Sequence, residues 1–289
     1  MKPSLLRRLA LQDDLNFLLT NRIPRITATH FMGWFSKIES PWLARLSIAI
    51  WRLFTDLDLS DAKTRRYRSL HECFTRELVE GARTVDMGES VISSPCDAIV
   101  AACGRVHEGQ IYQAKGLSYS LRELVGPDTD VTPFEEGAFV TLRLTSAMYH
   151  RFHAPHDISV HALNYISGDT WNVNPVTVRR IERLYCRNER AVIGARLEQW
   201  NAPILIVPVA AVLVASMRFH FADVLMHLRY RGPHRIRCDA ALRKGQEMGW
   251  FEHGSTIIVF VPAGFVPDAA VVEGARLRMG QALLHRSDV

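Results

Sequence analysis

The chain has 289 residues, of which 48% are hydrophobic and 22% are charged, so it can fill a sizeable core and is neither disordered nor collagen-like. Its 35 Lys and Arg residues against 30 Asp and Glu give a formal charge of +5, without the long basic runs of a nucleic-acid-binding arm, so no nucleic-acid partner is expected. Five cysteines without a CxxC pair argue against a disulfide framework or a zinc ribbon and favour a reducing compartment.

The first 60 residues predict helices and contain three of the six tryptophans. The segment PWLARLSIAIWRLF (41–54) begins with proline, which is favoured in a first helical turn, and places Leu43, Leu46, Ile50 and Leu53 at helical spacing. One interpretation is a helix that lies in the membrane interface with its apolar face in the acyl boundary. The alternative is an ordinary amphipathic helix packed on the domain, and periodicity alone favours this alternative.

Neither a signal peptide nor a transmembrane helix is expected. Asp13 and Asp14 follow the first apolar residues closely, and no small-residue cleavage site closes a hydrophobic stretch. The longest uncharged stretch lies between Glu198 and Arg218, but its two prolines and its many Val and Ile residues favour buried strands.

Near residue 90 the pattern changes to short β-branched runs separated by Gly, Pro and Asn. The runs predict strands at 91–92, 99–102, 139–144, 159–165, 204–214 and 256–261. A helical N-terminal region followed by a mostly antiparallel β-rich domain predicts an α+β fold. Nucleotide chemistry is not expected, because the GxGxxG and Walker motifs are both absent from the sequence.

A histidine-rich segment, MYHRFHAPHD, covers residues 148–157, and His161 follows it. Histidine gives and takes protons near neutral pH, so His150 and His153 are candidates for acid–base chemistry. Zinc binding is an alternative, but the segment matches no HExxH pattern and Pro155 disfavours a helix, so no metal site is expected. For any single histidine here, a hydrogen-bonded structural role is the more frequent one.

Two shorter segments supply an acid and a hydroxyl. Asp97 in SPCDA follows a proline turn, and Ser255 follows Gly254 in HGST, just before an apolar run. Each segment alone is typical of a turn that enters a strand. Together with a histidine they offer an orienting acid, a base and a nucleophile. A serine hydrolase is disfavoured, because nothing resembling GxSxG surrounds Ser255.

A series of uncommon strings, in order along the chain, resembles the phosphatidylserine decarboxylase family. The strings are FTREL (74–78), SPCDA (94–98), AKGLSYSL (114–121), YHRFHAP (149–155), SGDTWNVN (167–174), RNER (187–190) and KGQEMGWFEHGST (244–256). The likeness runs from about residue 45 to residue 262. It implies a helical membrane-associating region over residues 1–70 and a pyruvoyl-dependent decarboxylase domain over residues 71–289.

The resemblance implies a proenzyme that makes its cofactor from its own chain. Ser255 would attack the carbonyl of Gly254, with His153, oriented by Asp97, as the base. β-Elimination would then cut the chain between 254 and 255, and Ser255 would become a pyruvoyl group that forms a Schiff base with the substrate amine. After loss of carbon dioxide, His153 would protonate the carbanion. His150 would contact the carboxylate or the phosphate of the substrate.

The implied partners are the substrate phosphatidylserine, an anionic phospholipid membrane surface, and the large and small chains of one precursor; a homodimer is left open. The implied product is phosphatidylethanolamine, and the implied location is peripheral, on the cytoplasmic face of the cell membrane. The chain departs from the family at Ala98 and Ile158, which replace common glycines, and at His253, which replaces leucine. These departures keep two alternatives open: a pyruvoyl-dependent decarboxylase of a soluble amino acid, and a lipid-binding relative that is not processed.

Overall fold

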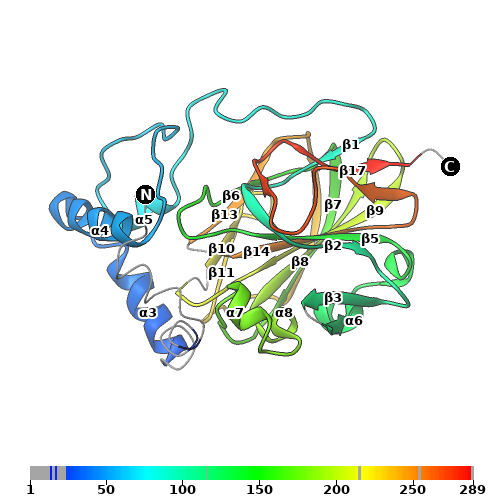
Figure 1. Ribbon diagram of the computed structural model, residues 1–289, viewed down its shortest axis with the longest axis horizontal. Helices are drawn as coiled ribbons and strands as arrows, with labels where there is room; N and C mark the ends of the chain where they lie inside the picture. Colours follow the sequence, from blue (N-terminus) through cyan, green and yellow to red (C-terminus); the bar gives the residue numbers. More distant parts are fainter. Residues whose placement is uncertain are drawn as a thin grey trace.

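The computed structural model describes residues 14, 17, 24–114, 116–213, 216–252 and 255–287. A helical part stands at one end of a β body, and short helices decorate the body (Figure 1). The helices are α3 (Arg25–Phe35), α4 (Pro41–Phe54), α5 (Leu70–Phe74), α6 (Leu121–Val125), α7 (Pro175–Val178) and α8 (Leu184–Arg187), with a 3-10 turn η1 (Thr132–Phe134). The candidate residue Gly254 and its neighbour His253 lie outside the described residues.

The β body consists of antiparallel sheets, so the predicted α+β class is confirmed. The strands are β1 (Val91–Ser93), β2 (Ala98–Arg105), β3 (Gln110–Ala114), β4 (Leu117–Ser120), β5 (Ala138–Arg143), β6 (Arg151–His153), β7 (Ile158–Ile166), β8 (Arg190–Leu197), β9 (Ala202–Val209), β10 (Ser216–Phe219), β11 (Val224–His227), β12 (Arg235–Leu242), β13 (Glu247–Phe251), β14 (Thr256–Val261), β15 (Phe265–Pro267), β16 (Arg276–Leu277) and β17 (Ala282–Arg286). The largest sheet has eight strands in the order β12-β7-β8-β9-β14-β5-β2-β16.

Three smaller sheets complete the body. One has the order β11-β10-β13-β6, another has the order β1-β17-β15, and β3 pairs with β4. The last four strands of the chain are therefore distributed between the large sheet and the β1-β17-β15 sheet: β14 lies between β5 and β9, β16 pairs with β2, and β17 pairs with β1.

The central strand β14 is buried on both faces. Its alternating side chains enter two different cores: Ile257 and Val259 belong to one cluster, and Ile258 and Phe260 to the other. A continuous apolar run is what a strand buried on both faces requires, and the sequence IIVFV supplies it. Ser255, directly before this strand, is therefore held by the most buried part of the sheet.

Strand β9 is shorter than the prediction of 204–214 because its chain leaves the sheet early. The N–H of Ala210 donates the last ladder-like hydrogen bond, to the carbonyl of Glu189. Leu213 then takes a positive φ of 69°, and its N–H donates to the hydroxyl of Thr29 on α3 at 3.0 Å. The apolar run thus continues as a turn that reaches the N-terminal helices.

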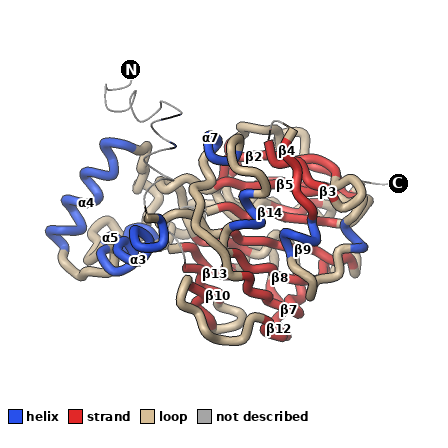
Figure 2. The backbone as a smooth tube through the Cα atoms, turned by 90° about the horizontal axis from the view of Figure 1, so that it is seen from below, coloured by secondary structure: helices blue, strands red, loops and turns tan. Residues whose placement is uncertain are grey.

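Helix α4 covers the predicted segment, with the Ser40 side chain accepting from the N–H of Leu43 and proline at the first position. Only Ala44 and Ile48 of this helix are buried. Most of the apolar stripe noted in the sequence is therefore not covered by the domain: Leu46, Ile50 and Leu53 are exposed. Figure 2 shows α3, α4 and α5 together at one side of the β body. Over the described ranges, the helices lack the length and apolar character that crossing a membrane would need.

Candidate active site

Ser255 lies at the start of the central strand with its side chain fully enclosed. The next residue, Thr256, pairs with Arg143 of β5 on one side and with Val209 of β9 on the other. The carbonyl of Ser255 accepts a hydrogen bond from the N–H of Leu144 at 2.8 Å. Its Oγ is buried and, among the described residues, has no hydrogen-bond partner. A buried hydroxyl without a partner is costly, so this atom is a candidate for a chemical role.

His153 lies on β6, and its backbone N–H donates to the carbonyl of Pro95 at 2.8 Å. Its ring Nε2 lies 3.5 Å from the hydroxyl of Tyr149, and its Nδ1 is buried with no partner in the described part of the chain. Burial lowers the pKa of His153 to about 4. The imidazole is therefore neutral near pH 7 and able to accept a proton.

Asp97 is buried, and its carboxylate is bound by Arg83 and by the backbone. Arg83 donates from Nε to Oδ1 at 2.8 Å and from a terminal nitrogen to Oδ2 at 2.5 Å, a bidentate pair. The N–H of Met279 donates to Oδ1 at 2.9 Å. A direct hydrogen bond from His153 is not among those that the described residues make to Asp97.

The link from Asp97 to His153 is instead indirect. The guanidinium of Arg83 lies 6.0 Å from the ring centre of Tyr149, whose hydroxyl is the partner of the His153 ring. Burial has the largest effect on the pKa of His153; the negative charge of Glu247 acts to raise this pKa, and that of Asp97 does so more weakly. Asp97, Arg83, Tyr149 and His153 thus form one polar group beside the buried core.

His150 is fully buried under a stack of aromatic rings. Its ring centre lies 4.1 Å from that of Phe74, and Phe74 stacks on Trp51 at 5.4 Å. The carbonyl of His150 accepts from the N–H of Phe251, which fixes the loop to β13. Phe74 and Trp51 line a cavity, and because Trp51 belongs to α4, the ring of Phe74 lies between His150 and this helix.

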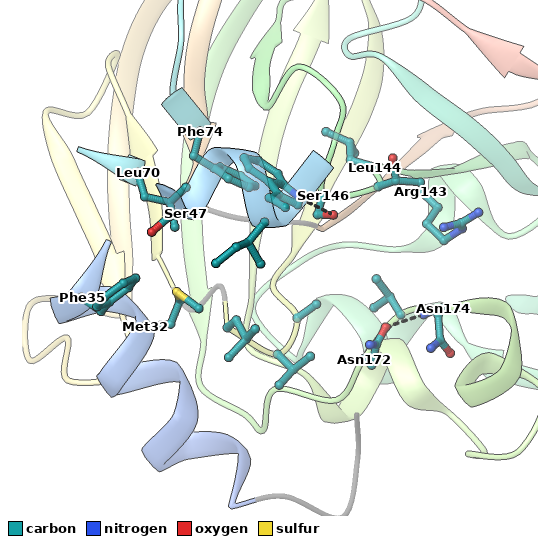
Figure 3. Close-up of a pocket in the computed structure, with 17 residues that line it drawn as sticks. Met32, Phe35, Ser47, Leu70, Phe74, Arg143, Leu144, Ser146, Asn172 and Asn174 are labelled. Atoms are coloured by element: carbon teal, nitrogen blue, oxygen red, sulfur yellow. Dashed lines mark hydrogen bonds between the residues drawn. The ribbon is translucent and has the colours of Figure 1, made fainter. Parts of the chain in front are cut away.

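That cavity has a volume of about 620 Å³ and lies between the N-terminal helices and the ends of β5 and β9. Figure 3 shows its lining: Met32 and Phe35 come from α3, and Arg143 and Asn174 lie at the opposite end. Leu144 lines it as well, and Leu144 is the residue whose N–H binds the carbonyl of Ser255. The cavity is mostly apolar, and Leu144 connects its wall to the backbone of Ser255, which is not among the described residues that line it.

Comparisons with known proteins identify the family of the chain. The family model for phosphatidylserine decarboxylase matches residues 70–285. The chain belongs to this family. It is 33% identical to the phosphatidylserine decarboxylase proenzyme of Aliivibrio salmonicida over 95% of this chain and 99% of the relative. It is 34% identical to the proenzymes of Vibrio campbellii and Vibrio cholerae, over 95% of this chain and 99% or 100% of those relatives.

Two departures from the family pattern are tolerated by the backbone. Ala98 begins β2 and Ile158 begins β7, both fully buried in the same core cluster. Neither is among the described residues with positive φ, so neither position requires glycine. The side chains of Ile158 and Ala98 instead fill the core under the sheet.

Sequence reasoning missed several residues around the site. Tyr149 stands inside the YHRFHAP string, which was the available signal, whereas nothing in the sequence marked Arg83 as the partner of Asp97. Glu189, from the RNER string, is fully buried and accepts from the hydroxyl of Tyr165 at 2.5 Å. Burial raises the pKa of Glu189 to about 7. Within the described ranges, no group of three His, Cys, Asp or Glu side chains is placed to hold a metal ion.

Proposed function

We propose that this member of the phosphatidylserine decarboxylase family converts phosphatidylserine to phosphatidylethanolamine and carbon dioxide after cleaving itself between Gly254 and Ser255. The observation that carries the proposal is the buried Oγ of Ser255, which lacks a partner among the described residues and stands at the start of the central strand. The enclosed position of Ser255 supports a pyruvoyl group there, and in this proposal the neutral imidazole of His153 supplies the base.

Cleavage uses His153 and Ser255 in the following way. His153 accepts the hydroxyl proton, and Oγ bonds to the carbonyl carbon of Gly254 while the peptide C–N bond breaks, giving an ester. Elimination then removes the α-hydrogen of residue 255 as a proton and breaks the bond between Cβ and Oγ, so a double bond forms between Cα and Cβ and this oxygen ends in the new carboxylate of residues 1–254. Water replaces the nitrogen at position 255, and ammonia leaves. Asp97 supports the base through Arg83 and Tyr149 and through its negative charge.

Decarboxylation uses the same residues again. The pyruvoyl group at position 255 supplies an electron sink for the electrons released with carbon dioxide. His153 takes up a proton in this step and passes it to the α-carbon of the product. His150 is the proposed contact for the carboxylate or the phosphate of the headgroup, and it lies beneath the ring of Phe74, which covers it in this structure. The buried surroundings exclude water from these transfers.

The N-terminal helices give the enzyme its membrane surface. Trp42 is 72% exposed and Leu53 is 69% exposed, and Phe31 and Trp34 of α3 are also exposed. An apolar face of this kind favours the boundary of a lipid bilayer, and Arg45 and Arg52 add attraction to anionic headgroups. The cavity between these helices and the β body lets a lipid enter from the membrane side. We place the protein on the cytoplasmic face of the cell membrane, with residues 1–70 as the membrane-associating region and residues 71–289 as the catalytic domain.

Mass spectrometry of the denatured protein tests the proposal. We expect a fragment of residues 255–289, lighter than its serine-started sequence by the change from an amino terminus to a pyruvoyl terminus, and release of carbon dioxide from phosphatidylserine vesicles. Ser255→Ala removes both, and His153→Ala abolishes or greatly slows cleavage. Ser118→Ala, which truncates an exposed serine of β4, is the matched control and changes neither. Cleavage of the Ser255→Ala variant, or a wild-type chain that stays whole, overturns the proposal.

A further inference from the structure

The cavity beside Ser255 has a single charged residue among its described lining residues, Arg143. The other described residues that line it are apolar or carry uncharged hydroxyl and amide groups. Arg143 is the last residue of β5 and is partly buried. It also lines a second cavity of about 250 Å³, so its guanidinium has open space around it.

The guanidinium of Arg143 makes no hydrogen bond or ion pair to the described residues. Other buried arginines of the chain are saturated: Arg190 donates to four backbone carbonyls, and Arg83 pairs with Asp97 and Asp61. Burial lowers the pKa of Arg143, and the nearby positive charge of Arg276 lowers it further, yet an arginine side chain keeps its charge in proteins. A charged group that is partly buried and unpaired has a cost in free energy, and a bound anion would lower this cost.

Arg143 is also close to the reacting position along the sheet. Its backbone pairs with Thr256, the residue after Ser255, and neighbouring strands lie about 4.8 Å apart. Asn172 and Asn174 lie at the same end of the cavity, whereas the apolar Met32 is contributed by α3 at the other end (Figure 3). The cavity is thus polar and positive at the end that holds Arg143 and apolar near the helices.

We infer that Arg143 binds the phosphodiester of the phospholipid substrate and so sets the position of the headgroup against residue 255; this inference rests on the proposed function. In the serine headgroup, one methylene and one ester oxygen separate the amine-bearing carbon from the phosphorus. An anion site beside Ser255 therefore matches the phosphate. A guanidinium binds two oxygens of a phosphate at once, and the apolar end of the cavity receives the acyl chains.

The carboxylate of the substrate is the less suitable anion for this site. It loses its charge as carbon dioxide forms, so an ion pair with arginine would stabilise the ground state more than the transition state and would slow the reaction. The phosphodiester keeps its charge throughout. This assignment leaves the carboxylate to the neighbourhood of His150.

Steady-state kinetics of Arg143→Gln test the inference. We expect normal cleavage of the chain, a KM for phosphatidylserine in mixed micelles raised at least tenfold, and a kcat changed less than about threefold, because a charged hydrogen bond is worth about 1.5–3 kcal/mol. Arg143→Lys keeps the charge without the fork and gives an intermediate KM. Arg237→Gln removes the same charge from an exposed position on the edge strand β12 and is the matched control.

A second measurement uses the wild-type protein and separates the two proposals. Glycerophosphoserine, which has the phosphodiester but no acyl chains, should compete with phosphatidylserine in the wild type and in Arg237→Gln at the same concentration, and in Arg143→Lys only at a several-fold higher one. If Arg143→Gln fails to fold, the competition measured in the wild type, Arg237→Gln and Arg143→Lys still tests the phosphate assignment. An unchanged KM, or equal competition in all variants, overturns the phosphate assignment while cleavage and activity persist. A wild-type chain that is neither cut nor active contradicts the proposed function instead.

Discussion

The β body and the N-terminal helices use apolar side chains in opposite ways. In the body, both faces of the central strand β14 are buried, and two clusters of apolar side chains fill the space on either side of the sheet. In α4, two residues are buried while five large apolar residues are exposed. The exposed residues are Trp42, Leu46, Ile50, Leu53 and Phe54.

This difference separates stability from function along the chain. Burial of apolar area is the main favourable contribution to folding, so the body supplies the free energy of unfolding. An exposed apolar face contributes little to the free energy of unfolding. Its apolar area can instead be buried against another surface, which favours association. The helices also form one wall of the cavity, so under the proposed function the surface that meets lipid and the cavity would share residues of α3 and α4.

The largest expected effect compares two phenylalanines. Phe260→Ala, in the core of the body, should lower the free energy of unfolding by about 3–5 kcal/mol, because it removes a fully buried ring and leaves a cavity. Phe54→Ala, at an exposed position of α4, should change it by less than about 1 kcal/mol. Urea unfolding in the uncut Ser255→Ala background measures both. Equal losses would show that the helices are part of the core.

The next effect is a pH dependence that comes from His153 in the body. The pKa of His153 is about 4 in the folded chain and about 6.5 when the residue is exposed, so between these values the unfolded chain binds more protons. Stability should therefore be complete above pH 6.5 and fall by at most roughly 3 kcal/mol as the pH decreases through 4.

The difference between the parent and a His153→Gln variant isolates this contribution. Urea unfolding at pH 7.5 and at pH 4.5, again in the Ser255→Ala background, should give a smaller loss in the variant. Glu189 has the opposite sign: its pKa is raised to about 7, so its contribution decreases as the pH rises toward that value. Identical pH profiles for parent and variant would mean that His153 is not buried in its neutral form.

The smallest expected effect on the free energy of unfolding comes from a variant that tests membrane binding. Leu53→Ser should leave the free energy of unfolding within about 0.5 kcal/mol and weaken binding to anionic vesicles several-fold, since an exposed leucine transferred into lipid contributes about 1 kcal/mol or more. Met87→Ser, at an equally exposed apolar position outside the helices, is the control. Vesicle co-sedimentation at low and high salt measures both. Equal binding by the two variants would contradict the proposed membrane surface.

Local patterns were sufficient where one segment decides its own structure. The strand at 256–261 and the helix at 41–54 match the structure because an unbroken apolar run and a capped, proline-started helix need little from distant residues. Strand β12 was not predicted, since its charged residues alternate with partly buried ones at the edge of the sheet. The end of β9 was predicted too late, because the turn there depends on Thr29 of a distant helix.

Local sequence patterns were also insufficient for parts of the candidate site that depend on distant segments. The position of Ser255 before a buried strand follows from the sequence, but its lack of a partner is a property of the packed structure. The pairing of Arg83 with Asp97 has no periodic spacing that could reveal it. A single arginine at the end of a strand gives no sign of being unpaired, so Arg143 became a candidate only when the cavity around it was visible.

The distribution of the last strands has a consequence for how the mature protein persists. Residues 255–289 contribute β14 to the middle of the large sheet, β16 to its edge and β17 to another sheet. Cleavage before Ser255 would therefore release no peptide, because removal of the short chain would require the whole body to unfold. Two separated chains would have to rebuild a sheet that lacks its middle strand. The protein would then fold only before cleavage, while the chain is continuous, and the two cut chains would not refold after unfolding. The lifetime of the cut enzyme would therefore be set by its rate of unfolding.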